Sequence, residues 1–377
     1  MEPFFGKTPR NAKFFEPLAH ANRHVYGRRR TVRKTTMTTS TELPAQKIRP
    51  IVAVVIPSFR VRDQVLDVIA AIGPDVDHIF VIDDACPEAS GAHVRANIED
   101  SRVQVVLHER NRGVGGATLT GYAKAVTAGA DIIVKLDGDG QMDPALIPGL
   151  IAPIAAGEAD YAKGNRFNRV DSLKAMPAMR ILGNLALSFF SKMSSGYWDV
   201  FDCTNGFTAI HAAVANQILT YKVSETYFFE SDMLYHLGQM RAVVVDVPMA
   251  ARYGSEKSNL SITWALFEFA AKHGVNALKR ILFGYFIRDF SVASIELILS
   301  FLLLTFGIVF GTMEWRESIA TGIAATAGTV VLAALPIILG SQLLIAFLNF
   351  DLRNVPRSPI HGRLNASVRG KSGVEGS

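Results

Sequence analysis

The stretch Asp131-Ile-Ile-Val-Lys-Leu-Asp137-Gly-Asp139-Gly-Gln-Met-Asp-Pro144 joins an apolar run to a pair of carboxylates. The Ile and Val residues are typical of a buried strand, and Asp137 and Asp139 follow it one residue apart. Alternate residues of an extended chain share a face, and if the chain turns here both carboxylates can still reach one cation. Hard oxygen ligands suit Mg²⁺ or Mn²⁺, which in turn bind phosphate oxygens. The same tripeptide also occurs in solvated turns, so its surroundings decide its role.

Three similar apolar runs precede this one, and segments of helical length separate them. The predicted strands are Ile51–Ile56, His78–Ile82, Val103–Leu107 and Asp131–Leu136, and the predicted helices are Val61–Ile72, Glu88–Asp100 and Val114–Ala128. Strands that alternate with helices predict βαβ units and a mainly parallel α/β sheet covered on both faces. In such sheets ligands bind beyond the carboxyl ends of the strands. The polar residues at those ends are Pro57-Ser58, Asp83-Asp84, Asn111 and Asp137-Gly138-Asp139.

The composition sets both ends of the chain apart from this region. Hydrophobic residues make up 49% of the 377, yet 39 basic and 34 acidic residues are also present. Residues 1–50 carry eleven Lys or Arg against three Asp or Glu, whereas residues 290–350 carry almost no charge. The remainder is nearly balanced, so the isoelectric point of about 9.1 belongs to the tails. It does not indicate a nucleic-acid-binding face.

The cysteines and the N-terminal residues favour a cytosolic setting. Cys86 and Cys203 form no C-x-x-C pair and have no histidine cluster beside them, which excludes a disulfide framework and a zinc site. The first 45 residues lack the apolar run of a signal peptide. We expect residues 1–48 to be a basic, disordered tail that is either solvated or in contact with anionic lipid headgroups.

Two uncharged stretches predict membrane spans. Leu297–Met313 has seventeen residues without a charge, and Ile319–Phe350 has thirty-two. A hydrocarbon core of about 30 Å needs about 20 apolar helical residues. The predicted spans are residues 290–313 and 321–348, joined by a turn at Glu314–Ser318. The alternative, two buried helices of a soluble domain, does not suit an uncharged stretch as long as the second.

Basic residues flank the pair of spans on their outer sides. These are Lys272, Lys279, Arg280 and Arg288 before the first span, and Arg353, Arg357, Arg363, Arg369 and Lys371 after the second. Basic flanks remain on the cytoplasmic side of a membrane. We therefore expect a multi-pass protein of the cell (inner) membrane. Its α/β domain (49–260), its basic C-terminal tail (351–377) and its N-terminus would all be cytosolic.

Residues 261–289 connect the α/β domain to the first span. Aromatic residues occur here among scattered basic ones: Trp264, Phe267, Phe269, Phe283, Tyr285 and Phe286. The pattern predicts amphipathic helices that lie in the membrane interface. Ordinary helices packed on the domain are the alternative.

Seven segments of the chain, in order, carry a resemblance to a known family. They are Ile56-Pro-Ser-Phe59, Val81-Ile-Asp-Asp-Ala-Cys86, Asn111-Arg-Gly-Val-Gly-Gly-Ala117, Asp137–Pro144, Lys163-Gly-Asn-Arg-Phe167, Asp202-Cys-Thr-Asn-Gly-Phe207 and Arg252-Tyr-Gly-Ser-Glu-Lys-Ser258. From Ile51 to about Leu260 the chain resembles the family-2 inverting glycosyltransferases with the GT-A fold. Within that family it is similar to the polyprenyl-phosphate group, which includes dolichol-phosphate mannose synthase and bacterial undecaprenyl-phosphate glucosyltransferases.

The resemblance implies a nucleotide site and a metal site. The implied nucleotide-binding residues are Pro57, Ser58, Asp84, Gly115, Asp137 and Gly138, with the Asp84 carboxylate accepting a hydrogen bond from the base. Asp139 is implied to be the principal ligand of Mg²⁺ or Mn²⁺, assisted by Asp137 and with Gln141 as a further ligand. By itself, Asp83 or Asp84 also fits a turn-forming residue, and the Gly-rich segment also fits a helix start.

The resemblance also implies contacts to the phosphates of donor and acceptor. The candidates are Arg166, Arg180, Arg252, Lys257 and Ser258. Arginine suits planar, bidentate anion contacts, although each arginine also fits an ion-paired or surface cation. Ser258 equally fits the cap of a helix over Asn259–Leu266.

Glu230, in Phe228-Phe-Glu-Ser-Asp232, is chosen over Asp232 as the acidic residue that the family places close to the acceptor. In transfer to sugar hydroxyls such a residue is the general base. A lipid monophosphate is already largely an anion at neutral pH. We therefore expect Glu230 to position substrate more than to abstract a proton.

Some positions depart from the family pattern. Arg60-Val61 follows the first strand where the family has Asn-Glu, with Asp63 two residues late, and Cys86 stands where serine is common. These departures affect the contacts to base and ribose and leave the metal site unchanged.

The predicted function is inverting, metal-dependent transfer of a hexose from a UDP- or GDP-hexose to a polyprenyl monophosphate at the cytosolic membrane face. The expected partners are the nucleotide-sugar, the lipid phosphate and the membrane, with no nucleic acid; a homo-oligomer is compatible with two spans. A polysaccharide-elongating transferase would carry a Q-x-x-R-W motif, which is absent, and more spans. A catalytically silent nucleotide-binding scaffold would not need the carboxylate pair. A dinucleotide-binding oxidoreductase would need a G-x-G-x-x-G after the first strand.

Overall fold

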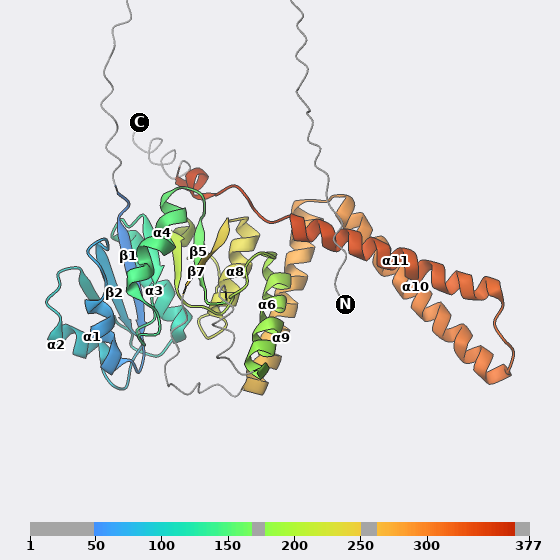
Figure 1. The fold of residues 1–377 in the computed structure, drawn as a ribbon, viewed down its shortest axis with the longest axis horizontal. Coiled ribbons are helices and arrows are strands. Elements are labelled where there is room, and N and C mark those ends of the chain that lie inside the picture. The colour runs from blue at the N-terminus through green and yellow to red at the C-terminus, as the bar shows by residue number, and fades with distance from the viewer. Residues whose placement is uncertain (1–48, 168–177, 250–261, 366–377) are drawn as a thin grey trace, which may run out of the picture. The chain divides into compact units, whose positions relative to one another are not determined.

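The computed structural model describes residues 49–167, 178–249 and 262–365. Within these ranges the chain forms a seven-stranded sheet in the order β3-β2-β1-β4-β6-β5-β7 (Figure 1). The strands are β1 (Val52–Ser58), β2 (His78–Asp83), β3 (Val103–Leu107), β4 (Ile132–Lys135), β5 (Tyr161–Asn165), β6 (Thr208–His211) and β7 (Val244–Pro248). All neighbouring pairs are parallel except those of β6, which runs antiparallel to β4 and β5. The prediction of a mainly parallel α/β sheet is confirmed.

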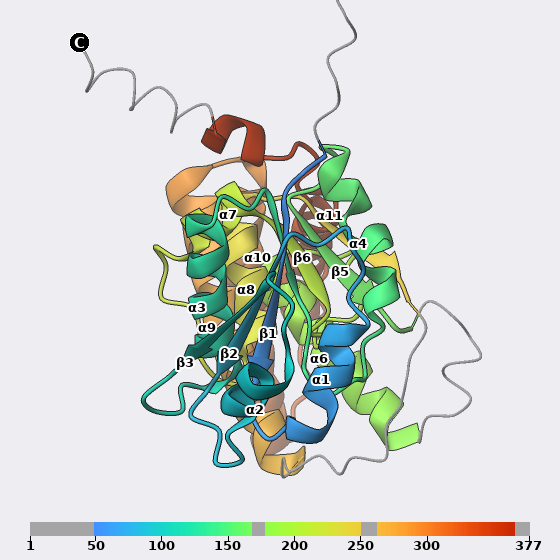
Figure 2. The same cartoon turned by 90° about the vertical axis from the view of Figure 1, so that its left-hand side faces the viewer.

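Helices cover both faces of the sheet (Figure 2). One face packs against α1 (Arg62–Ala70), α2 (Ser90–Asn97) and α4 (Ile147–Ala155), and the other against α3 (Gly113–Thr127), α7 (Ala212–Ile218) and α8 (Phe229–Met240). Because side chains alternate along a strand, Val52, Val54 and Ile56 of β1 enter the first core while Ala53 and Val55 enter the second. This double burial explains why the strands are almost uninterrupted Val and Ile.

The four predicted strands and three predicted helices all form, with ends displaced by at most a few residues. The predicted strand Val103–Leu107 matches β3 at both ends. Strand β1 runs two residues beyond the predicted Ile51–Ile56, so Pro57 and Ser58 belong to the strand. Gly121 of α3 lies so close to β1 that a Cβ there would be 2.1 Å from Val55 Cγ1. Glycine therefore sets the distance between this helix and the sheet.

Helices α6 (Ala178–Ser195) and α9 (Ile262–Ile281) pack against each other and against α8. Helix α9 continues into a short π-helical segment, η2 (Leu282–Arg288). The prediction that residues 261–289 are helical is thus confirmed for the part that the structure describes. Their position in a membrane interface stays a prediction.

Two long apolar helices follow, α10 (Val292–Thr321) and α11 (Ala327–Arg353), and both are long and apolar enough to cross a membrane. They pack against each other through glycines: a Cβ on Gly307 would lie 2.7 Å from Ile337 Cγ1, and one on Gly340 would lie 2.9 Å from Leu304 Cγ. Small residues at such crossings are typical of helices that associate in lipid.

The predicted turn at Glu314–Ser318 is wrong. Helix α10 continues through these residues to Thr321, and Gly322, with a φ of +68°, ends it. Charged residues such as glutamate and arginine favour helices, whereas glycine accepts the left-handed conformation that terminates one. The charged residues at Glu314–Ser318 end the apolar stretch, but the helix itself continues to Thr321.

Both ends of the helical pair are bonded to the rest of the fold. Near the end of α11, the buried carboxylate of Asp351 accepts hydrogen bonds from Arg280 (2.7 and 3.0 Å), Tyr285 (2.5 Å) and Trp198 (2.9 Å). Farther along, the backbone N–H of Ile360 donates to both oxygens of Asp160, which has no exposed surface. The chain therefore leaves and rejoins the α/β domain on either side of α10 and α11.

Candidate active site

A fully buried lysine lies at the centre of the candidate site. Lys135, the last residue of β4, is 1% exposed, and its ammonium group lies 2.6 Å from Asp137 Oδ1 and 3.2 Å from Glu230 Oε1. It also donates to the backbone carbonyl of Gly206 (3.3 Å). Burial lowers the pKa of Lys135, but the two carboxylates outweigh it and raise the pKa above its usual value. Protonated Lys135 therefore holds Asp137, in the loop after β4, next to Glu230 of α8.

The sequence interpretation missed Lys135, although the sequence contained a signal for it. A lysine inside the run Ile132-Ile-Val-Lys135 sits in a strand buried on both faces. A charge can remain in such a place only when it is paired. A carboxylate partner from elsewhere in the chain was therefore to be expected.

The loop after β4 presents Asp137 and Asp139 at the carboxyl end of the sheet, as the sequence predicted. Both side chains are partly exposed, and Asp139 Oδ1 accepts a hydrogen bond from the backbone N–H of Gln141 (3.0 Å). Gly206 lies against this loop, and a Cβ there would be 2.5 Å from Asp137 Oδ2. Only glycine at 206 leaves the Asp137 carboxylate in place.

The donor set of this loop fits Mg²⁺ or Mn²⁺. Two carboxylates and the side-chain amide oxygen of Gln141 are hard ligands, and Mg²⁺ is commonly bound by one or two carboxylates with phosphate oxygens and water completing the octahedron. Within the described ranges no group of three or more His, Cys, Asp or Glu side chains is placed to hold a metal. A metal at Asp137 and Asp139 would take its remaining ligands from Gln141, water or a bound substrate.

Helix α8 delivers Glu230 into this site and turns Asp232 away from it. Glu230 is 12% exposed and faces Lys135. Asp232 accepts hydrogen bonds from the backbone N–H of Ser224 (2.8 Å) and from Asn276 Nδ2 (3.0 Å). Burial raises the pKa of Asp232, but hydrogen bonds from His236, Ser224 and Asn276 outweigh burial and lower it. Asp232 is thus bonded within the fold, which supports the choice of Glu230.

The carboxylates at the end of β2 both fix local structure. Asp83 accepts from the backbone N–H groups of Cys86 (2.7 Å) and Gly91 (2.6 Å) and so holds the turn into α2. Asp84 is 2% exposed and accepts from the N–H groups of Arg112 (2.8 Å) and Gly113 (2.7 Å), and its Oδ1 lies 2.7 Å from His108 Nδ1. Contact of Asp84 with a nucleotide base stays a prediction.

The Gly-rich segment packs against the loop that precedes α8. The N–H groups of Gly115 and Gly116 both donate to the carbonyl of Glu225, at 2.9 and 3.1 Å. A Cβ on Gly115 would lie 2.4 Å from the carbonyl oxygen of Ser224. The close approach that glycine permits here is therefore to the chain itself, and the assignment of Gly115 to the nucleotide is not tested by this contact.

The remaining nucleotide candidates lie near the Asp137 loop. Ser58 ends β1 with its side chain buried, and its hydroxyl has no hydrogen-bond partner among the described residues. Pro57 precedes it in the same strand. Gly138 is buried, and a Cβ there would be 3.1 Å from Val61 Cγ2.

Of the phosphate candidates, the structure describes the surroundings of Arg166 alone. Its guanidinium group makes two hydrogen bonds to the buried Asp202, from Nε to Oδ2 (2.8 Å) and from Nη2 to Oδ1 (2.9 Å). The side chain of Arg180, in α6, and residues Arg252, Lys257 and Ser258 lie outside the described residues. Asp202 orients Arg166, which is 27% exposed.

A mainly parallel α/β sheet with carboxylates at its carboxyl edge fits the GT-A fold. Residues 53–219 match the family model described as glycosyl transferase family 2. The chain is 30% identical over 179 residues to an undecaprenyl-phosphate mannosyltransferase of Micrococcus luteus, an alignment that covers 47% of this chain and 72% of that protein. The chain therefore belongs to glycosyl transferase family 2.

The chain is also similar to a second relative and to a solved structure. The chain is 34% identical over 152 residues to the UDP-N-acetylglucosamine–dolichyl-phosphate N-acetylglucosaminyltransferase of Methanococcus voltae, covering 40% of this chain and 60% of that protein's length. Among solved structures, glucosyl-3-phosphoglycerate synthase from Mycobacterium tuberculosis in complex with Mn²⁺, UDP and glucosyl-3-phosphoglycerate aligns with a TM-score of 0.47 and 18% identity. That alignment covers 62% of this chain and 81% of that one.

Proposed function

We propose that this chain is an inverting glycosyltransferase that moves a hexose from a UDP- or GDP-hexose to a polyprenyl monophosphate at the cytosolic membrane face. Residues 49–260 would form the catalytic domain and residues 290–313 and 321–348 the spans. Residues 261–289 would lie between them at the interface, with basic tails at 1–48 and 351–377. The relatives from Micrococcus luteus and Methanococcus voltae are named for transfer to undecaprenyl and dolichyl phosphate, which supports the choice of acceptor.

The observation that carries the proposal is the pair of carboxylates joined by Lys135. Asp137, from the loop after β4, and Glu230, from the start of α8, contact the same buried nitrogen. We assign Asp137 to the donor side and Glu230 to the acceptor side of this one site at the carboxyl edge of the sheet. It suits a reaction in which two substrates meet.

The proposed reaction is a single in-line displacement. An oxygen of the lipid phosphate attacks the anomeric carbon of the hexose, the bond from that carbon to the diphosphate oxygen breaks, and the electron pair leaves with the nucleoside diphosphate. Asp137 and Asp139, with Gln141, would hold Mg²⁺ or Mn²⁺, which when bound neutralises charge on the leaving diphosphate. No proton has to be removed from a phosphate that is already an anion.

The protein's own groups would align the reactants. Glu230 is held by a buried ammonium group, which suits a carboxylate that positions substrate more than one that takes up a proton. Arg166, oriented by Asp202, is a candidate contact for a phosphate. Arg180, Arg252, Lys257 and Ser258 remain candidates for the other phosphate contacts, and Asp84, Pro57, Ser58, Gly115 and Gly138 for the nucleotide.

The bonds around α10 and α11 support placing the acceptor at the membrane. Arg280 and Tyr285 precede α10 and bind Asp351 at the end of α11. The two helices therefore start and finish at the same place in the fold. If both cross a membrane, the α/β domain lies on the side where the basic flanks lie, which we propose to be the cytosolic side.

One panel of assays tests the proposal. Membranes that contain the protein are mixed with undecaprenyl or dolichyl phosphate, Mg²⁺ or Mn²⁺, and each labelled nucleotide-sugar in turn. Label should enter the organic phase with one donor, which identifies sugar and nucleotide together. An Asp139→Asn variant should lose that signal, whereas Asp143→Asn, in the same loop, should keep it. If no donor labels lipid and label appears in a polymer, the protein elongates polysaccharide instead.

A Glu230→Gln variant separates the two roles of this carboxylate. Under the proposal it should weaken turnover by misplacing substrate, with a similar loss at every pH where the phosphate is ionised. A variant that still binds both substrates yet is inactive at every pH would restore the role of general base.

A further inference from the structure

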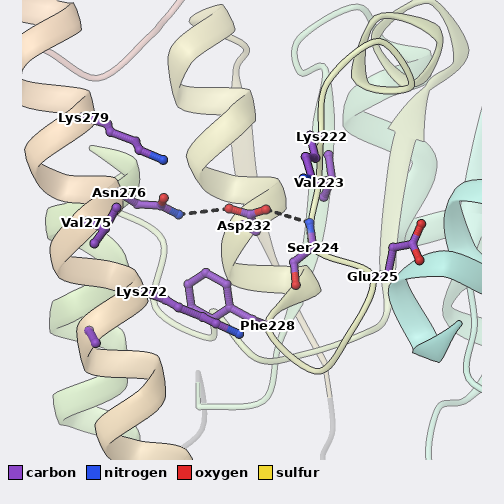
Figure 3. Close-up of a pocket in the computed structure, with 11 residues that line it drawn as sticks. Lys222, Val223, Ser224, Glu225, Phe228, Asp232, Lys272, Val275, Asn276 and Lys279 are labelled. Atoms are coloured by element: carbon purple, nitrogen blue, oxygen red, sulfur yellow. Dashed lines mark hydrogen bonds between the residues drawn. The ribbon is translucent and has the colours of Figure 1, made fainter.

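A cavity of about 650 Å³ lies between α9 and the segment that leads into α8 (Figure 3). Its lining comes from Lys222, Val223, Ser224, Glu225, Phe228 and Asp232 on one side and Ala271, Lys272, Val275, Asn276 and Lys279 of α9 on the other. None of these residues belongs to the candidate active site. Its size falls within the range of small-molecule sites.

Three lysines from two elements reach this cavity. Figure 3 shows Lys272 and Lys279 extending from α9 toward the segment that carries Lys222. Lys272 pairs with Glu268 at 2.7 Å and lies over the ring of Phe228. Within the described ranges, the ammonium groups of Lys222 and Lys279 form no ion pair.

Both carboxylates of the lining already accept hydrogen bonds from neighbouring groups. Asp232 accepts from Ser224 and Asn276, as the dashed lines of Figure 3 mark. Glu225 pairs with Arg112 of the Gly-rich segment at 2.5 Å. The cavity therefore keeps an excess of positive charge above an apolar floor made by Phe228 and Val223, which suits an anion that carries an apolar portion.

The outer face of α9 and the first residue of η2 add a row of exposed apolar side chains beside the lysines. Phe267, Val275 and Leu278 of α9 and Leu282 of η2 are 75%, 52%, 59% and 49% exposed. An apolar row flanked by lysines is the pattern of a helix that lies against a lipid surface.

The cavity also lies near the base of the apolar helices. Lys279 is adjacent in sequence to Arg280, which binds Asp351 near the end of α11. Lys272 lies seven residues earlier on α9, about 10 Å away at 1.5 Å per residue. The end of the cavity that Lys279 lines is therefore the end nearest to the base of α11.

We propose that this cavity binds the phosphate headgroup of an anionic phospholipid of the surrounding membrane, with Lys222 and Lys279 contacting the phosphate. The occupant is a bulk membrane lipid and not the acceptor of the reaction. Its binding stabilises the segment Lys222–Phe228, which packs against Gly115 on one side and leads directly to Glu230 on the other. The site is independent of which sugar the enzyme transfers.

Lipid binding is measured directly, without turnover. The full chain is purified in detergent, delipidated and titrated with phosphatidylglycerol, phosphatidylcholine or undecaprenyl phosphate, and bound lipid is counted by native mass spectrometry. We expect phosphatidylglycerol to be retained over phosphatidylcholine. Lys222→Gln/Lys279→Gln should weaken phosphatidylglycerol binding about 25-fold, from about fivefold for each neutralised lysine. Lys124→Gln, an exposed lysine of α3 outside the cavity, is the matched control and should change nothing.

Two results would overturn the proposal. Equal binding of phosphatidylglycerol by the double variant and the parent protein would show that the cavity takes no headgroup. Loss of undecaprenyl phosphate binding with phosphatidylglycerol binding intact would show that the cavity serves the acceptor. Since Lys222 and Lys279 are exposed, the double variant should melt with the parent protein, and a Lys222→Arg/Lys279→Arg variant should retain the lipid.

Discussion

Replacement of Lys135 by methionine should expose how strongly the candidate site depends on one buried charge. Methionine has similar length and no charge, so the change leaves the carboxylates of Asp137 and Glu230 facing each other without a cation. Breaking a buried ion pair by removing one partner costs about 3–5 kcal/mol. In a domain of this size each kcal/mol lowers Tm by about 2–4 °C, so we expect a decrease of about 6–20 °C.

Lys163 provides a matched control for this change. It is the other fully buried lysine of the sheet, in β5, and it donates to the carbonyl of Asn205. Burial lowers the pKa of Lys163, and the charges of Glu230 and Asp202 offset this only in part. Lys163→Met removes a hydrogen bond and not an ion pair, so its cost should be about 1–3 kcal/mol.

A third variant isolates the charge. Lys135→Met/Glu230→Gln removes one of the two unpaired carboxylates and should recover part of the lost stability. Melting is followed by circular dichroism in detergent, and transfer of label to lipid is measured well below each Tm. Turnover by folded Lys135→Met should still decrease, by 100-fold or more, because Asp137 and Glu230 are no longer held together. Equal melting of Lys135→Met and Lys163→Met, with no recovery in the double variant, would refute the role given to Lys135.

Three other predictions concern groups outside that ion pair. Burial lowers the pKa of His273 to about 4. As the pH falls below about 6.5, the unfolded chain therefore takes up a proton at this residue, whereas the folded chain does not. The free energy of unfolding should decrease by about 3 kcal/mol between pH 6.5 and 4. A His273→Gln variant should lose this part of the dependence, and melting curves parallel to those of the parent protein would contradict it. Burial raises the pKa of Cys203 to about 11, whereas at Cys86 hydrogen bonds from Ser90 and from nearby backbone N–H groups outweigh burial and lower the pKa. Iodoacetamide at pH 8 should therefore modify Cys86 at least 100-fold faster than Cys203. A bound nucleoside diphosphate should slow the modification of Cys86. Asp351→Ala leaves Arg280 buried without its carboxylate and should cost about 3–5 kcal/mol, measured as a lower Tm in detergent; a Tm within 2 °C of the parent's would show that this bond does not hold the helices to the domain.

Strands β1, β2, β3 and β4 could be predicted because each is short, rich in Val and Ile and followed by turn residues. Strand β5, which reads Tyr-Ala-Lys-Gly-Asn with a buried lysine that donates to Asn205, gave no such pattern, and neither did β6, Thr-Ala-Ile-His. Strand β7 was missed although it is rich in valine. The long-range partners of Lys135 and Arg166 were equally hidden. Glu230 and Asp202 are distant in sequence, and only the fold brings them to those cations.

For the glycine at 115, the sequence correctly predicted that another group would approach closely, but it did not identify that group. A glycine at 115 predicts close approach of another group, and the structure supplies the carbonyl of Ser224 as that group. Sequence alone could not distinguish a phosphate from the chain's own backbone, because both demand the same missing Cβ.

The bond between Asp160 and Ile360 has a consequence for the order in which this protein is made. The two residues are 200 positions apart, and the intervening chain contains both apolar helices. At about 5–20 residues per second a ribosome needs roughly 10–40 s to cover that distance. Throughout this interval the Asp160 carboxylate can accept from the N–H of Val243 (2.8 Å) but not from those of Ile360 and His361, so its full set of hydrogen bonds forms only after the apolar helices have been synthesised.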